Sequence, residues 1–242
     1  MHVLDSHVHC GLTLPYRVIK QRWNDGDIEG GVLFSPAEEI YDRFDPSFVD
    51  SDFYRNSRQK VHSYLKSLIS EKVFAYWFVW TDYELPWEDF VGIKWHRHPD
   101  EPRYDYSCQE CYRFIKEACM RSLPIIIEEE FENTLYLIKQ IDSKTAVIIP
   151  HFGMLNGGYM RLKEAGVFEN PMVYVDTALA SSGSIRDFAG DYGVDRILFG
   201  SDFPFGEPAH EKRKVEAIFS GPEKEKVMGK NLLELLDKNI TV

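Results

Sequence analysis

The chain has 242 residues, of which 39 are acidic and 28 basic, giving a formal net charge of -11 at pH 7. This charge disfavours nucleic acid and anionic membranes as partners, because both are negatively charged. No apolar run approaches the roughly 20 residues of a transmembrane helix, and no signal peptide is evident, so we expect a cytoplasmic protein with one domain spanning residues 1–242.

The first predicted strand lies within residues 1–11 (MHVLDSHVHCG). Alternation along a strand predicts that Asp5, His7 and His9 share one face, opposite Leu4, Ser6 and Val8. Two imidazoles two residues apart at a strand end can hold one divalent metal ion. An isolated pair of this kind is more often an ordinary polar strand end, so the rest of the chain has to decide.

Further apolar runs alternate with helical patterns along the chain. Strands are predicted at 30–35, 73–80, 91–98, 124–129, 146–151, 172–177 and 196–202. Helices are predicted at 15–23, 52–71, 107–122, 130–142, 157–165, 181–191, 208–219 and 222–237. With the first strand this alternation indicates a (β/α)8 TIM barrel with a C-terminal helix. It is somewhat irregular, since no long helix fits between the third and fourth strands. No Gly-x-Gly-x-x-Gly follows a strand, which disfavours a dinucleotide-binding fold.

A Cys-x-x-Cys pair at Cys108 and Cys111 could bind metal or carry out redox chemistry. However, both cysteines share an apolar helical face with Ile115, Ala118 and Cys119. We therefore interpret them as small residues packed against the core.

Polar residues end several of the predicted strands, and this pattern carries the functional argument. They are His7 and His9 on the first strand, Lys94 and His96 on the fourth, Glu128 on the fifth, His151 on the sixth and Asp202 on the eighth. In a barrel the C-terminal strand ends meet at one rim. Singly, His151 could cap a strand, Asp202 could form a turn and Lys94 could pair with Glu128. Together they favour a site, because burying them without partners would cost several kcal/mol each.

In these motifs the chain resembles the metal-dependent amidohydrolase superfamily, in particular the branch of aminocarboxymuconate-semialdehyde decarboxylase and related lactone hydrolases. The matching stretches are Asp5-Ser-His-Val-His9, Gly92-Ile-Lys-Trp-His96, Pro124-Ile-Ile-Ile-Glu128, Ile148-Ile-Pro-His-Phe-Gly153, Leu198-Phe-Gly-Ser-Asp-Phe-Pro204 and residues 224–236.

The resemblance implies one divalent metal ion held by His7, His9, the fifth-strand residue and Asp202, with His151 facing the substrate. The family usually has histidine where this chain has Glu128. Zinc is the expected metal, and a carboxylate at this position could favour manganese, or zinc of reduced Lewis acidity. Alternation along the strand selects Glu128 and Glu130 rather than Glu129. Alternatively, Glu128 bridges two ions, the second bound by His151; Lys94 occupies the position of the carboxylated lysine that bridges metals in some members.

The function expected from this resemblance is hydrolysis of a small molecule at a carbonyl centre by a metal-activated water. Asp202 would accept a proton, and His151 would act as general acid-base. Lys94, His96 and Arg97, or alternatively Arg103, would bind an anionic substrate group. The alternatives are a decarboxylase, a TatD-like phosphoesterase and a catalytically degenerate binding barrel. The expected partner is a small-molecule substrate, and a homodimer is one candidate assembly.

Overall fold

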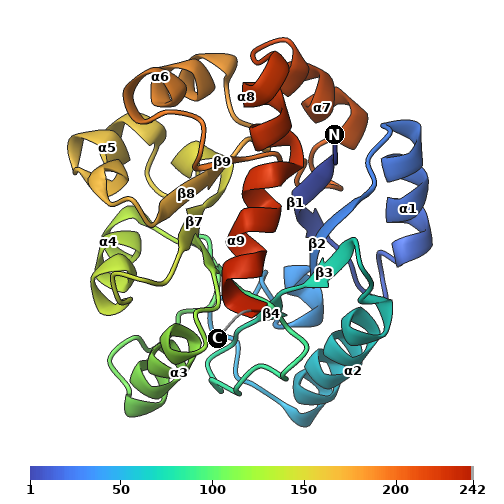
Figure 1. Cartoon of the computed structure of the whole chain (residues 1–242). Helices are drawn as coiled ribbons and strands as arrows, with labels where there is room; N and C mark the ends of the chain where they lie inside the picture. The colour runs from blue at the N-terminus through green and yellow to red at the C-terminus, as the bar shows by residue number, and fades with distance from the viewer. Residues whose placement is uncertain (241–242) are drawn as a thin grey trace.

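In the computed structural model, which describes residues 1–240, helices surround a ring of parallel strands (Figure 1). The strands are β1 (Leu4–His9), β2 (Gly30–Phe34), β3 (Val73–Ala75), β4 (Trp77–Phe78), β5 (Ile93–His96), β6 (Ile125–Glu128), β7 (Val147–Ile149), β8 (Val173–Asp176) and β9 (Ile197–Leu198). They form two sheets, with the orders β1-β2-β3 and β4-β5-β6-β7-β8-β9.

Backbone hydrogen bonds join the two sheets at both ends. The N–H of Tyr76 donates to the carbonyl of Leu33, and the next N–H, of Trp77, donates to Gly92, so β3 and β4 form one interrupted strand. On the other side, the N–H of Ser6 donates to Phe199 over 2.8 Å, and the N–H of Asp202 donates to His7 over 2.8 Å. With β3 and β4 counted together, the nine strands occupy eight positions of a closed ring, which confirms the predicted TIM barrel.

The helices agree with the predicted alternation except near the C-terminus. They are α1 (Tyr16–Asp25), α2 (Asp52–Leu68), α3 (Gln109–Met120), α4 (Phe131–Gln140), α5 (Tyr159–Glu164), α6 (Ser182–Tyr192), α7 (Pro208–Glu216), α8 (Gly221–Glu225) and α9 (Asn231–Ile240). The single helix predicted at 222–237 is instead α8 and α9 joined by a π-helical turn, Lys226–Lys230. Among the described residues no helix lies between β4 and β5, and none is long and apolar enough to cross a bilayer.

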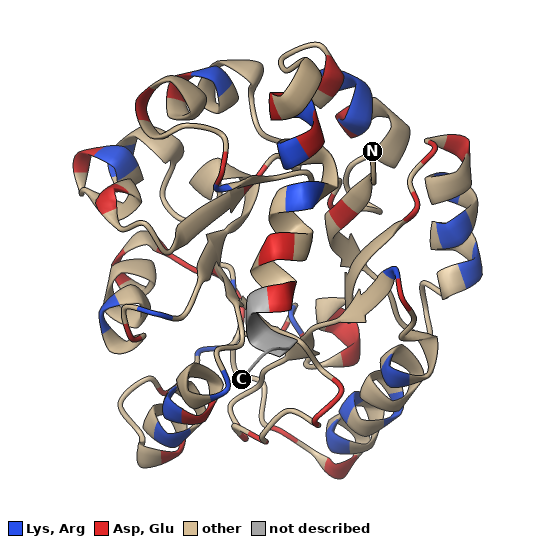
Figure 2. Ribbon diagram, viewed as in Figure 1, with Lys and Arg blue, Asp and Glu red and all other residues tan. Residues whose placement is uncertain are grey.

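The sequence of each helix explains which side it buries. Ser51 caps α2, its side chain accepting from the N–H of Tyr54, and Val61 and Leu65 face the core. Cys111 on α3 is buried and Cys108 caps that helix, both as free thiols, in agreement with their structural interpretation. Charged residues of both signs lie along the surrounding helices (Figure 2).

The inside of the ring has two chemically different ends. Toward the N-terminal strand ends, Leu4, Ile126 and Leu198 pack with Leu232 and Leu235 of α9 in one apolar cluster. In Figure 1, α9 lies across the middle of the ring. The C-terminal strand ends on the opposite side carry the polar residues. Apolar side chains therefore close one end of the barrel, and polar side chains line the other.

A β-bulge in β1 corrects one prediction. Asp5 pairs with Gly31 of β2, but the next pair is Val8 with Leu33, so β1 has one residue more than β2 in this interval. The extra residue reverses the alternation, and Asp5 points away from His7, where it accepts hydrogen bonds from Ser201 Oγ (2.6 Å) and Trp23 Nε1 (3.2 Å). The predicted common face for Asp5, His7 and His9 is therefore wrong.

Candidate active site

The barrel brings the strand-end residues together at one rim. His7 and His9 end β1, Lys94 and His96 end β5, and Glu128 ends β6. His151 lies two residues after the end of β7, and Asp202 lies four residues after the end of β9. All seven side chains are buried. His151 (φ 55°) and Asp202 (φ 57°) have left-handed backbone conformations, which cost energy and are common at functional sites.

One group of possible metal ligands consists of His7, His9 and Asp202. Oδ1 of Asp202 lies 3.1 Å from Nε2 of His9 and 3.4 Å from Nε2 of His7. Burial lowers the pKa of His7 to about 4, aided by the charge of Lys94, so its ring is neutral at pH 7. Burial raises the pKa of Asp202, but the hydrogen bond from His9 and the nearby histidines outweigh this and lower it to about 2. Neutral imidazole and ionised carboxylate are the forms that bind metals.

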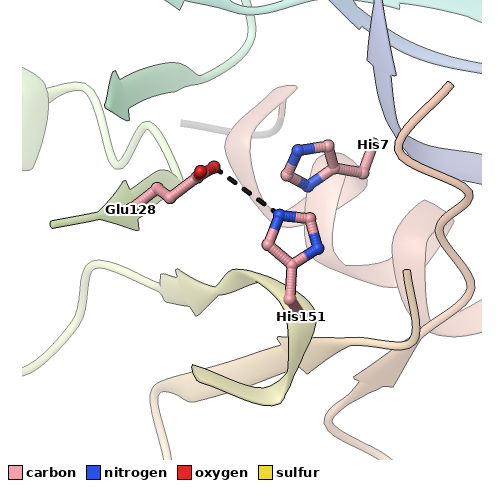
Figure 3. Close-up of side chains that lie close together, drawn as sticks. All are labelled: His7, Glu128 and His151. Carbon is pink, nitrogen blue, oxygen red and sulfur yellow. Dashed lines mark ion pairs between the residues drawn. The ribbon is translucent and has the colours of Figure 1, made fainter. Parts of the chain in front are cut away.

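A second group consists of His7, Glu128 and His151, whose side chains point toward one another in Figure 3. Nε2 of His151 lies 3.6 Å from Oε2 of Glu128 and 3.8 Å from Oδ2 of Asp202. Its Nδ1 donates to the carbonyl of Ala178 over 3.1 Å. Burial lowers the pKa of His151, but the hydrogen bond and charge of Glu128 outweigh this and raise it to about 9. His151 therefore holds a proton at neutral pH.

Glu128 is the centre of the cluster. Its Oε2 accepts from Nζ of Lys94 over 2.6 Å, and its Oε1 lies 2.8 Å from Nε2 of His98. Burial would raise the pKa of Glu128, but the charge of Lys94 and the neighbouring histidines hold it well below its usual range. The structure thus brings Glu128, rather than Glu130, to the rim, whereas Glu130 pairs with Arg97.

Sequence reasoning missed Asp176, which ends β8. Its Oδ2 accepts from Nδ1 of His7 over 2.8 Å, and its Oδ1 accepts from the backbone N–H of His151 over 2.9 Å. This carboxylate fixes the tautomer of His7, so that Nε2 carries a lone pair, which Nζ of Lys94 approaches at 3.4 Å and which can bind a metal. The signal was present, because Asp176 ends the predicted strand 172–177 in the same way as the residues that were selected.

A pocket of about 160 Å³ opens onto the cluster, lined by His9, Arg43, His96, His98, Glu128, Leu155, Leu179, Asp202 and Phe205. Arg43 comes from the loop after β2, and it is ion paired with Glu38 and with Glu101. Lys94 does not line this pocket, because it is fully buried against Glu128. A larger hollow of about 540 Å³, beside α3, has no histidine in its lining.

The structure does not bring Arg97 into this pocket. Its guanidinium donates to Oε1 of Glu129 over 2.8 Å and to the carbonyl of Pro99 over 3.1 Å. Arg97 follows His96 directly, so alternation turns its side chain to the other face of the strand. There it lines a separate pocket of about 300 Å³ together with Arg103.

The donor atoms suit a divalent metal ion. Nε2 of His7 and of His9 and a carboxylate oxygen of Asp202 converge, and Glu128 and His151 lie within the same cluster. Nitrogen and oxygen ligands of this kind fit Zn²⁺ and similar ions. Asp176, behind His7, supplies the supporting hydrogen bond that metal-binding histidines usually have.

Comparisons with known proteins identify the family and the fold. Residues 89–238 match the model of a family described as amidohydrolase. A 2,6-dihydroxybenzoate decarboxylase in complex with 2,6-dihydroxybenzoate has 13% identity and a TM-score of 0.69, with 98% of each chain covered. A structure described as a probable 2-pyrone-4,6-dicarboxylic acid hydrolase from Acinetobacter baumannii, with citric acid bound, has 12% identity and a TM-score of 0.69, covering 98% of this chain and 100% of that one.

A 5-carboxyvanillate decarboxylase from Sphingomonas paucimobilis is similar at 8% identity, with a TM-score of 0.66 and coverage of 98% of this chain and 99% of that one. At these sequence identities, the structural similarity shows that the fold is shared and nothing further. No curated protein matches the chain.

Proposed function

We propose that this chain, which belongs to the amidohydrolase family of enzymes, is a metal-dependent hydrolase acting at the carbonyl carbon of a small carboxylated molecule. The observation that carries the proposal is the convergence of His7, His9 and Asp202 beside a protonated His151 at one pocket. This set combines metal ligands, a base and an acid.

His7, His9 and Asp202 would hold the ion, with Glu128 as the fourth ligand. Bound there, a divalent ion polarises a substrate carbonyl and makes water more acidic. The two imidazoles favour Zn²⁺, and the carboxylates make Mn²⁺ the alternative.

Side chains of the protein would carry out proton transfer, oxyanion stabilisation and substrate binding. Asp202 is ionised at neutral pH because its pKa is lowered to about 2, so its carboxylate carries no proton and can accept one from a water that the ion has made more acidic. His151, protonated at Nε2, can stabilise the developing oxyanion and donate its proton to the leaving group. Arg43 lines the pocket and offers a guanidinium to an anionic substrate group.

A carboxylated substrate is supported by two observations. Arg43 is a cation at the pocket wall. The structural neighbours described above are named for dihydroxybenzoate, pyrone dicarboxylate and carboxyvanillate, each of which carries a carboxylate. The pocket volume of about 160 Å³ lies below the roughly 300–1,000 Å³ of pockets for drug-sized ligands, which favours a small molecule over a polymer.

Decarboxylation is the second candidate, favoured by the raised pKa of His151. Loss of carbon dioxide leaves a carbanion that must be protonated, and a histidine protonated at pH 7 beside the pocket is a suitable donor. Two of the structural neighbours reported above are named as decarboxylases.

The test combines metal analysis with a substrate panel. Protein purified without chelator should contain divalent metal. It should turn over a member of a panel of lactones, aryl amides and carboxylated phenols, and carbon dioxide release would select the second candidate. His9→Ala and Asp202→Asn should lower kcat/KM by at least ~100-fold with an unchanged circular dichroism spectrum. His210→Ala, at an exposed position on α7, is the matched control.

Full activity in metal-free protein would overturn the proposal. Turnover of a chromogenic phosphodiester alone would indicate a phosphoesterase. Metal binding without turnover anywhere in the panel would indicate a binding barrel.

A further inference from the structure

Two histidines beside the proposed metal site have no part in the mechanism above. His96 ends β5, and His98 lies two residues beyond it, so both point to the same side of the segment. Their ring centroids are 4.6 Å apart, and both rings face the carboxylate of Glu128. We propose that His96, His98 and Glu128 form a second divalent-cation site, with Glu128 bridging the two ions. The inference rests on the proposed function only through the ion held by His7 and His9.

The two oxygens of Glu128 face different neighbours. Oε2 contacts Nζ of Lys94 and lies 3.6 Å from Nε2 of His151, on the side of His7. Oε1 lies 2.8 Å from Nε2 of His98 and 3.3 Å from Nε2 of His96. A carboxylate that presents one oxygen to each of two nitrogen clusters has the arrangement needed to bridge two ions.

Hydrogen bonding behind His96 prepares its Nε2 as a ligand. Tyr41 donates its hydroxyl proton to Oε2 of Glu101 over 2.7 Å, and Nδ1 of His96 lies 3.1 Å from the same hydroxyl oxygen. Because the tyrosine has one proton, Nδ1 of His96 acts as the donor to it, and the lone pair of Nε2 points at Oε1 of Glu128. Two lone pairs 3.3 Å apart repel, and a cation between them converts this repulsion into attraction.

The hydrogen bonds of His98 have to change when an ion binds. Its Nδ1 accepts from Nη2 of Arg43 over 3.2 Å, so the ring proton lies on Nε2 and is donated to Oε1 of Glu128 over 2.8 Å. An ion bound through Nε2 takes the place of this proton, which moves to Nδ1. Oε1 of Glu101 lies 3.6 Å from Nδ1, is ion paired with Arg43 and is buried, and within residues 1–240 it accepts no hydrogen bond, so it can accept that of Nδ1–H. The side chain of His98 is 31% exposed, so an ion can reach it through the pocket.

Two imidazoles and one carboxylate form a ligand set of intermediate softness. It suits Zn²⁺, Co²⁺ or Mn²⁺ better than Ca²⁺ or Mg²⁺, which prefer oxygen ligands. An ion held there would lie in the wall of the pocket that also contains His9 and Asp202. It would therefore meet an anionic oxygen of the substrate while the first ion acts on the carbonyl.

The test counts ions and does not depend on activity. Protein stripped with a chelator is reloaded with Zn²⁺, passed through a desalting column and analysed for metal, and each affinity is measured by calorimetry. We expect two ions per chain in the wild type and one in His98→Ala, with the affinity of the remaining ion little changed. His9→Ala should keep the second ion and lose the first. In Tyr41→Phe the affinity of the second ion alone should fall ~10–100-fold.

Bridging has its own spectroscopic signature. When loaded with Mn²⁺, the wild type should give an exchange-coupled electron paramagnetic resonance spectrum, and His98→Ala the six-line spectrum of an isolated ion. His210→Ala is the control for an exposed histidine, and His98→Gln replaces His98→Ala if the latter does not fold.

The outcomes separate the two proposals. One ion in both the wild type and His98→Ala overturns the second site and leaves the proposed function intact. Two ions in both place the second ion elsewhere and also overturn the inference. No ion in the wild type overturns both proposals.

Discussion

The protonation of His151 depends on its neighbour Glu128. Burial alone favours the neutral ring, yet the hydrogen bond and negative charge of Glu128 raise the pKa of His151 from 6.5 to about 9. One carboxylate thereby keeps the proposed general acid protonated at neutral pH. The opposite effect occurs at His7, where burial and the charge of Lys94 lower the pKa and keep this proposed metal ligand neutral.

This coupling predicts how His151 titrates before an ion is bound. A raised pKa means that the proton is present below about pH 9 and lost above it, so in chelator-treated protein the ring should titrate near pH 9. In Glu128→Gln the charge is removed, and the titration should move down toward the ordinary histidine value of 6.5. The measurement is the pH dependence of the His151 ring signals by NMR in chelator-treated wild type and variant. A titration that stays in place in the variant would show that Glu128 does not set the protonation of His151.

At the scale of secondary structure, the bulge in β1 connects the fold to the site. It turns His7 inward and sends Asp5 outward to a buried position, where Ser201 and Trp23 bind its two oxygens. Burial raises the pKa of Asp5 to about 7 despite these hydrogen bonds. Because Ser201 precedes Asp202 directly, the same contact holds the segment that carries a proposed metal ligand.

Ser201→Ala should therefore destabilise the protein more than an ordinary serine substitution. It removes the hydroxyl donor to a fully buried carboxylate, which should cost ~1–3 kcal/mol in the free energy of unfolding. The measurement is urea denaturation at pH 8. The matched control is Ser107→Ala, because Ser107 makes the same serine–aspartate hydrogen bond to Asp105 at an exposed position, and there we expect less than about 0.5 kcal/mol. Equal losses in the two variants would contradict this role for Ser201.

The strand-end pattern predicted most of the rim, because the barrel places every C-terminal strand end there regardless of the loops. The positions that the sequence did not predict depend on local backbone geometry. The bulge that inverted Asp5 leaves no clear mark in the sequence, since one extra residue in a strand looks like any other. Arg97 was wrongly predicted to bind substrate, because it is adjacent to His96 in the sequence and its side chain therefore points to the opposite face of the strand. Arg43 was missed because it comes from the loop 36–50, whose path depends on tertiary contacts.

At the scale of the whole molecule, an apolar cluster and the candidate active site lie at opposite ends of the barrel. Leucines of α9 close one end, while charged residues and candidate metal ligands lie at the other. The proposed first ion would join β1 to the segment after β9, which are separated by almost the whole chain, since His9 and Asp202 are 193 residues apart. It would also hold together Asp202 and Glu128, two ionised carboxylates that share this end.

Metal removal should therefore lower the melting temperature. An ion that binds only the folded chain stabilises it by ~2.7 kcal/mol when its free concentration is 100-fold above Kd. For a chain of this size that corresponds to a shift of about 5–10 °C. Differential scanning fluorimetry of chelator-treated protein, titrated with Zn²⁺ or Mn²⁺, should show a rise that follows the logarithm of metal concentration.

Two matched variants test whether the shift in melting temperature comes from an ion at the proposed site. His210→Ala should respond to metal as the wild type does, whereas His9→Ala, which lacks a proposed ligand, should show a clearly smaller rise. A response of equal size in His9→Ala would mean that the stabilising ion binds away from the rim. A melting temperature that is the same with chelator and with saturating metal would show that no ion ties the first strand to the last.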